Sequence, residues 1–314
     1  MDGPLENGRS PADPPGSGAD SIIDSVFIGP FGLRAGWRLA IYIGSFYFLV
    51  YAISFLIAPL LTHLPDNLLQ QSYLLLIGDF VEFVAAVVPA LVLSRLELRP
   101  FGAYGLPPLQ AFRKNFWIGT LWGILSLTIL LAVMRAIHVF YFGRLAVHGG
   151  RAVKFAVFWG AVFLMVAFYE EFITRGYTQF TLADGIAFWP AAVITSTFFG
   201  ISHLTNPGEN WTGAVGAGFI GLFWCFTLRR TGSLWFGIGM HAAWDWGESF
   251  LYSVPDSGLL APGHLIRSSF HGPRWLTGGP VGPEGSVLII VLFAGLWFLF
   301  DRLYPEVKYG QSKP

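Results

Sequence analysis

Residues 168–177, FYEEFITRGY, place two adjacent carboxylates and an arginine in an otherwise apolar stretch. An ionisable side chain near the centre of a membrane helix costs about 2.5 to 3.5 kcal/mol, so such a group indicates function. Glu171 and Arg175 are four residues apart and can form an ion pair along one helix face. Glu170 is rotated by about 100° from Glu171 and lacks that partner. We therefore expect Glu171 to be structural and Glu170 to face a cavity, where it can act on a substrate.

Two histidines occur at helical spacing from other polar or aromatic residues. Phe199 and His203 share a face in FFGISHL, and His241, Asp245 and Glu248 share one in GIGMHAAWDWGESF. A lone histidine in an apolar helix is more often a packing residue. Two histidines on separate helices, together with an unpaired glutamate on a third, favour a shared site instead.

The chemistry that suits these groups is peptide hydrolysis. A carboxylate and an imidazole can share the proton of a bound water and make it nucleophilic, while other donors stabilise the oxyanion that develops. We expect Glu170 to be the general base, His203 to hold or co-activate the water, and His241 to donate to the oxyanion. The same Glu170, His203 and His241 could instead be zinc ligands, since one glutamate and two histidines with an open position form a known catalytic set.

The elements that must position these residues are membrane helices. Hydrophobic residues make up 54% of the 314 and charged residues only 12%, a combination that soluble domains rarely reach. An apolar run of about 20 residues spans the hydrocarbon core as a helix. Eight runs meet this description: 39–61, 72–94, 116–138, 154–178, 187–205, 212–228, 232–253 and 286–303.

We predict an all-α polytopic bundle of about eight transmembrane helices with both termini in the cytoplasm. Alternating assignment places thirteen Lys and Arg residues on the cytoplasmic side and six outside, in agreement with the positive-inside rule. The domain prediction is a disordered tail at 1–30, a transmembrane protease-like domain at 31–305 with its motif core at 150–250, and a short tail at 306–314. The zero net charge gives no basic patch for nucleic acid, and the single Cys225 excludes an intramolecular disulfide.

Three ordered motifs in separate runs carry a resemblance to a known family. They are Glu170-Glu171-x-x-x-Arg175, Phe199-x-x-x-His203 and His241-x-x-x-Asp245. Together they resemble the CPBP family of intramembrane proteases, which includes the CAAX-processing endopeptidases and the bacteriocin-immunity, or Abi-like, proteins. The resemblance covers roughly residues 150–250.

The resemblance implies a helical membrane fold with a water-accessible cavity lined by Glu170, His203, His241 and Asp245. It implies an endopeptidase whose substrate is a membrane-bound protein or peptide, prenylated or with an apolar leader, in a bacterial inner membrane. The family was named for metalloproteases, but the resemblance favours a metal-free glutamate mechanism. The last motif of the family often ends in Asn, and Asp245 departs from it because an ionised carboxylate cannot donate a hydrogen bond to an oxyanion.

Two other functions stay open at this point. Asp79 and Glu82 share a face of the second run, and acid pairs inside helical bundles serve as proton relays in carriers. A non-catalytic immunity or scaffold protein could also keep the motif for folding, with Glu171 and Arg175 as a structural pair.

Overall fold

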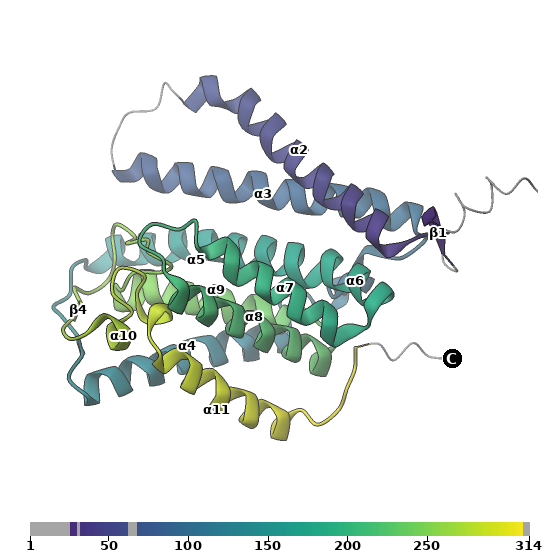
Figure 1. Ribbon diagram of the computed structural model, residues 1–314. Coiled ribbons are helices and arrows are strands. Elements are labelled where there is room, and N and C mark those ends of the chain that lie inside the picture. Colours follow the sequence, from purple (N-terminus) through teal and green to yellow (C-terminus); the bar gives the residue numbers. More distant parts are fainter. Residues whose placement is uncertain (1–25, 30–31, 62–67, 310–314) are drawn as a thin grey trace, which may run out of the picture.

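The computed structural model describes residues 26–29, 32–61 and 68–309, and they form an almost entirely helical molecule (Figure 1). Its long helices are α2 (Ala35–Leu61), α3 (Leu68–Leu96), α4 (Lys114–Ala136), α5 (Gly149–Glu171), α6 (Thr178–Ile186), α7 (Phe188–His203), α8 (Trp211–Thr231), α9 (Trp235–Trp246) and α11 (Leu288–Leu303). The short elements are η1 (Phe101–Tyr104), η2 (Pro108–Gln110), η3 (Phe172–Tyr177), η4 (Gly247–Tyr252), α10 (Arg274–Thr277) and η5 (Pro283–Gly285). Two small antiparallel sheets pair β1 (Ile28–Gly29) with β2 (Gly32–Leu33) and β3 (Phe140–Tyr141) with β4 (Ser269–Phe270).

Helices occupy all eight of the predicted apolar runs, but they differ in length. Five helical segments of the described chain are long and apolar enough to cross a membrane: Ala35–Leu61, Tyr73–Leu96, Lys114–Ala136, Gly149–Ile186 and Trp211–Thr231. Helices α7 and α11 have 16 residues each and α9 has 12. At 1.5 Å per residue, 16 residues reach about 24 Å, which is less than a hydrocarbon core of about 30 Å. The structure therefore supports five candidate spans rather than the eight we expected.

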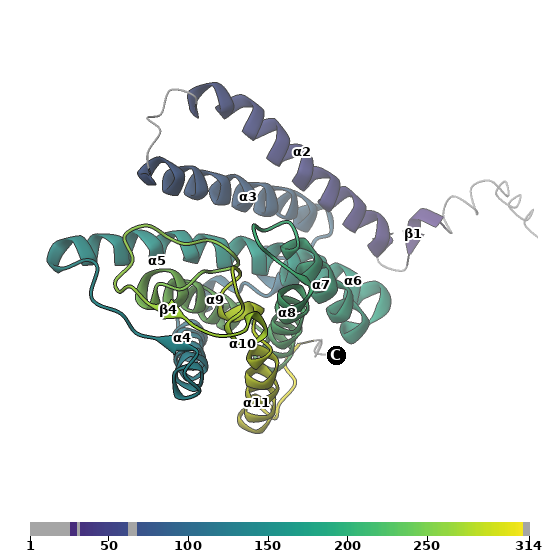
Figure 2. The same ribbon diagram turned by 60° about the vertical axis from the view of Figure 1, so that its left-hand side comes forward.

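The two helices α8 and α9 lie at the centre of the bundle (Figures 1 and 2). Helix α9 contacts α4 and α5, and α8 contacts α7 and α11. The pair α2 and α3 lies outermost against α5 and α6, and its two helices diverge toward the connection between them (Figure 2). Eleven consecutive residues of α9, from Trp235 to Asp245, are buried. Because α9 is enclosed by other helices on all sides, its second histidine motif lies inside the bundle.

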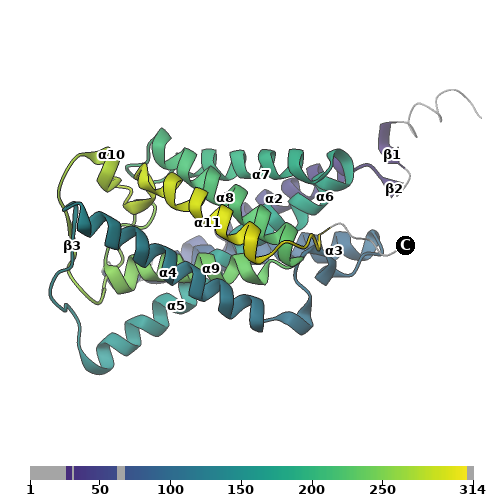
Figure 3. The same ribbon diagram turned by 90° about the horizontal axis from the view of Figure 1, so that it is seen from below.

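Glycines let α4 and α9 approach closely (Figure 3). A Cβ atom at Gly119 would lie 2.1 Å from the carbonyl oxygen of Phe236, and one at Gly123 would lie 2.3 Å from that of Met240. On the α9 side of the contact, a Cβ at Gly239 would lie 2.2 Å from the carbonyl oxygen of Phe116 in α4. Backbones packed this tightly hold α9 in a fixed position, and with it His241.

The outer face of α4 is apolar and exposed. Trp117, Leu121, Leu125 and Ile129 recur every four residues and are 50 to 62% exposed. A continuous apolar stripe of this kind is typical of a surface covered by another apolar medium. In a helix that meets the criteria for a membrane span, that medium is the lipid bilayer.

The predicted tail at 1–30 lies outside the described residues, apart from 26–29. Residues 306–309 of the predicted C-terminal tail pack against the bundle. The amide of Lys308 donates to the carbonyl oxygen of Arg229, and the ring of Tyr309 lies against Phe180 and Phe188.

Candidate active site

A cavity of about 310 Å³ opens between α3, α5, α7, α8 and α9. Its wall includes Glu170, His203, His241 and Asp245, the four residues predicted to be catalytic. They come from three segments that are separated in sequence, at the end of α5, the end of α7 and the second half of α9. The structure thus places the four residues around one space, while their chemical roles remain predictions.

Glu171 and Arg175 form the predicted ion pair. Nη1 of Arg175 lies 3.0 Å from Oε1 of Glu171, and both side chains are almost fully buried. The guanidinium also lies 4.2 Å from the ring centroid of Phe199 and 5.2 Å from that of Trp224. Aromatic faces attract a cation, so these rings replace part of the hydration that Arg175 loses. The ring of Phe199 therefore stabilises the charge of Arg175, and it also lies beside His203.

The backbone of this segment departs from a regular α-helix. Residues Phe172–Tyr177 form a π-helical turn, with a kink at Gly176 where φ is −84° and ψ is −114°. A π turn shifts the side chains around it and is frequent at functional sites. Helix α8 leaves room for Arg175 because Gly221 has no side chain at this point. A Cβ at Gly221 would lie 2.2 Å from Nη2 of Arg175.

His241 is surrounded by carboxylates. Its Nδ1 lies 3.3 Å from Oε1 of Glu171, and its Nε2 lies 3.4 Å from Oδ2 of Asp245 and 3.7 Å from Oε2 of Glu170. The ring stacks on Trp224, with a centroid distance of 4.3 Å. Glu171 thus contacts both Arg175 and His241, so it orients a site residue in addition to pairing with the arginine. The sequence did not predict that second contact, since it joins two helices.

Glu170 is directed toward the cavity and is 21% exposed. Its Oε1 accepts a hydrogen bond of 3.2 Å from the hydroxyl of Tyr169. The 3.7 Å between its Oε2 and Nε2 of His241 is too long for a direct hydrogen bond. One water can bond both atoms at this separation. Glu170 is thus free of Arg175, as predicted, but it has polar neighbours that helix spacing alone did not reveal.

His203, the last residue of α7, is held by its own helix. Its Nδ1 lies 2.8 Å from the carbonyl oxygen of Phe199, and its ring lies 4.5 Å from the Phe199 ring. This contact leaves Nε2 available to the cavity. In the described part of the chain, His203 makes no ion pair with Glu170.

The cavity also contains carboxylates outside the three motifs. Asp79 of α3, which we considered only for a proton relay, lies on its wall together with Asp256 and Glu284. Asp256 and Glu284 lie in the region between α9 and α11, in a Pro- and Gly-rich connection. Helical periodicity carries no information there, so no sequence signal indicated that they reach the site.

Two acids in the loops near the cavity have perturbed titration. Burial and the nearby Glu284 carboxylate raise the pKa of Asp256 well above its usual range, and a hydrogen bond from Ser249 only partly opposes this. Burial also raises the pKa of Glu209, in the loop between α7 and α8, against a hydrogen bond from the Asn210 amide.

Zinc bound by Glu170, His203 and His241 was the alternative predicted for this site. Ligand atoms that bind one ion must lie within a few ångströms of one another. Among the described residues, Glu170, His203 and His241 are not a group whose ligand atoms all lie within 4.8 Å of one another. The set as placed does not fit one zinc ion.

Comparison with protein families matches residues 152–247, about a third of the chain, to the family described as Type II CAAX prenyl endopeptidase Rce1-like. A search of curated proteins finds no match. The matched segment contains all three motifs and four of the five elements that form the cavity.

Proposed function

We propose that the chain, whose residues 152–247 match the type II CAAX prenyl endopeptidase Rce1-like family, is an intramembrane endopeptidase whose site is the cavity around Glu170. The observation that carries the proposal is the separation of 3.7 Å between Oε2 of Glu170 and Nε2 of His241 on the wall of one cavity. A water between these two atoms would lie beside a base and a donor at once.

In the proposed mechanism, the carboxylate of Glu170 takes a proton from the bound water as its oxygen attacks the peptide carbonyl carbon. His203 holds the water through Nε2, since its Nδ1 is already bonded to the carbonyl oxygen of Phe199. His241 donates a hydrogen bond to the oxyanion, and Glu170 then gives its proton to the leaving amine nitrogen as the peptide bond breaks.

The supporting residues fix the orientation of these groups. In this proposal the His241 ring carries both protons, so that Glu171 accepts from Nδ1–H and Nε2–H is directed toward the cavity as the oxyanion donor. Arg175 compensates the buried charge of Glu171. Asp245 lies against Nε2 of His241, so in this proposal it orients that ring and leaves the oxyanion to other donors.

The substrate class that suits such a site is a membrane-associated protein or peptide, prenylated or with an apolar leader. The chain would be a multi-pass protein of a bacterial inner membrane, with eight passes and both termini in the cytoplasm. The three helices too short to span alone would then cross with the help of their flanking residues and a thinned bilayer.

The proposal is tested with the purified protein in bicelles, a farnesylated CAAX-type peptide and a membrane-anchored apolar leader peptide. Mass spectrometry should detect a hydrolysed peptide bond in at least one of them, and His203→Ala should remove at least about 99% of the rate. A zinc chelator should leave the rate unchanged. Loss of activity with the chelator and its recovery with zinc would support the alternative ligand set of Glu170, His203 and His241.

A second candidate function rests on Asp79, which lines the same cavity as Glu170. Acids that share a space within a helical bundle can relay protons. In liposomes with an internal pH dye, a carrier would move protons and lose this activity in Asp79→Asn. A peptidase would cleave peptides without proton flux, and a binding protein without catalysis would show neither activity.

A further inference from the structure

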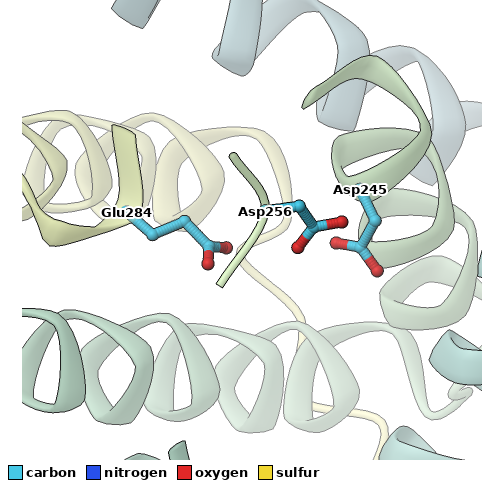
Figure 4. A group of neighbouring side chains, drawn as sticks. All are labelled: Asp245, Asp256 and Glu284. Carbon is cyan, nitrogen blue, oxygen red and sulfur yellow. The ribbon is translucent and has the colours of Figure 1, made fainter. Parts of the chain in front are cut away.

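Three carboxylates on the wall of the cavity lie close together (Figure 4). Asp245 comes from α9, Asp256 from the loop after η4, and Glu284 from η5. One oxygen from each lies within 4.8 Å of the other two. Figure 4 shows the side chains of Asp245 and Glu284 directed toward Asp256 from opposite sides.

The described residues that line the cavity include no lysine or arginine to neutralise this cluster. The polar contacts of the cluster are few: Ser249 donates to Oδ2 of Asp256 at 3.1 Å, Ser257 donates to Oε2 of Glu284 at 2.7 Å, and Nε2 of His241 lies 3.4 Å from Oδ2 of Asp245. Most of the lone pairs in the cluster are therefore free to bind something else.

A fourth acid supplies independent evidence for a missing cation. Glu248, three residues after Asp245, is completely buried, and neither of its carboxylate oxygens has a hydrogen-bond partner among the described residues. Its carboxylate lies within electrostatic range of Glu284, Asp256 and Asp245. A buried carboxylate without a partner is stabilised either by taking up a proton or by a cation nearby.

The loops that carry two of these carboxylates are fixed against each other. The amide of Gly258 donates to the carbonyl oxygen of Val281 at 3.1 Å. A Cβ at Gly282 would lie 2.0 Å from the carbonyl oxygen of Pro255, so the backbones of the two loops are in direct contact. Asp256 and Glu284 are thus held in place, and the site is formed before any ligand arrives.

The spacing of the oxygens is compatible with Ca²⁺. Oxygens on opposite sides of a Ca²⁺ ion, each about 2.3 to 2.6 Å from it, are about 4.6 to 5.2 Å apart, and around the smaller Mg²⁺ the limit is about 4.2 Å. The three oxygens, all within 4.8 Å of one another, are close enough together to bind Ca²⁺ without movement.

We propose that Asp245, Asp256 and Glu284 bind one divalent cation of the calcium class at the wall of the cavity. The ion would tie the loops at 254–259 and 278–285 to α9. It would fix the Asp245 carboxylate, which contacts His241, and so position that ring without taking part in the reaction. Ca²⁺ binding can be measured whether or not the protein cleaves peptides, so its failure and the failure of the peptidase proposal are distinguishable.

The test uses the full-length protein in detergent, stripped with a chelator and titrated with Ca²⁺ alone or Mg²⁺ alone. Calorimetry should show one saturable Ca²⁺ site, with Mg²⁺ at least about tenfold weaker. At 100 times the dissociation constant, Ca²⁺ should raise the thermal midpoint by about 5 °C. Asp256→Asn and Glu284→Gln should weaken Ca²⁺ binding at least about tenfold, and Glu306→Gln, which removes an exposed acid, should not.

The sign of the stability change separates loss of binding from misfolding. Without Ca²⁺, Asp256→Asn removes repulsion inside the cluster, so its thermal midpoint should equal or exceed that of the parent. With saturating Ca²⁺ the order should reverse. The proposal is wrong if the parent shows no saturable Ca²⁺ binding, or if Asp256→Asn keeps the full Ca²⁺-dependent shift.

Discussion

At the scale of single residues, the adjacent acids Glu170 and Glu171 have opposite environments. Glu171 is buried between Arg175 and His241, whereas Glu170 is directed toward the cavity. A one-residue step around a helix moves a side chain by about 100°, which is enough to separate a structural carboxylate from one available to a substrate. Substitution should therefore affect stability at one position and chemistry at the other.

Replacing Glu171 should destabilise the fold. Glu171→Gln keeps the shape of the side chain but leaves the buried guanidinium of Arg175 without its counter-ion, which costs about 3 to 5 kcal/mol. Thermal unfolding in detergent should show a clearly lower midpoint. Glu306→Gln, in an exposed pair of 3.9 Å, should leave the midpoint unchanged, and equal midpoints for the two variants would refute the structural role of Glu171.

Replacing Asp245 should have little effect on cleavage. In Asp245→Asn the amide retains an oxygen beside Nε2 of His241, and its N–H group becomes able to donate to an oxyanion. We expect a cleavage rate within about tenfold of the parent, measured at saturating Ca²⁺ with the peptide that the parent cleaves best. A complete loss of cleavage by a folded variant would show that the negative charge itself is required.

At the scale of elements, the contact between α4 and α9 positions His241. Gly123→Ala would bring a Cβ atom to 2.3 Å from the carbonyl oxygen of Met240, the residue before His241. Overpacking of this kind costs about 1 to 3 kcal/mol, so both the thermal midpoint and the cleavage rate should fall.

Gly295→Ala is the matched control for that substitution. It also changes a glycine inside a helix, but its Cβ would meet no atom within 4 Å. Alanine favours a helix over glycine by about 1 kcal/mol, so the control should be as stable as the parent or more stable. If both variants behave alike, close packing of α4 on α9 does not position the site.

The sequence predicted the parts of this molecule that depend on helical spacing. Hydropathy located the helices, and a spacing of four residues predicted the Glu171–Arg175 pair and the shared face of Phe199 and His203. The expectation that Glu170, His203, His241 and Asp245 share one cavity agrees with their positions. These features follow from local geometry, because a helix fixes which side chains are neighbours.

Other parts of the site could not be predicted because they depend on contacts between distant segments. Asp256 and Glu284 reach the cavity from loops, and Glu171 touches His241 across two helices. The π turn at Phe172–Tyr177 replaces the regular helix assumed for the fourth run. In the seventh run the regular α-helix ends at Trp246, because residues Gly247–Tyr252 form the π turn η4.

At the scale of the whole molecule, an apolar outer surface and a largely apolar core enclose a polar cavity. Exposed aromatic and aliphatic side chains cover α2 and α4, while the acids and histidines described above line the cavity or lie next to it. A polar cavity inside an apolar exterior suits the proposed hydrolytic chemistry within a bilayer.

The proposed topology has both termini on the cytoplasmic side. Tags at the N-terminus and at the C-terminus should therefore be protected from protease in intact spheroplasts and both become sensitive after lysis. A tag at residue 148, in the loop before α5, should be accessible from outside. Termini on opposite sides of the membrane would require an odd number of passes and would refute the eight-pass arrangement.

The central claim is that Glu170 activates a water for peptide hydrolysis. The most direct measurement is the rate of cleavage of a membrane peptide in H₂¹⁸O by the parent and by Glu170→Gln, with Glu306→Gln as a control for loss of one acid. The account predicts one ¹⁸O atom in the new carboxyl terminus, a rate in Glu170→Gln lower by at least about 100-fold, and an unchanged thermal midpoint. Cleavage by Glu170→Gln at the parental rate would contradict it.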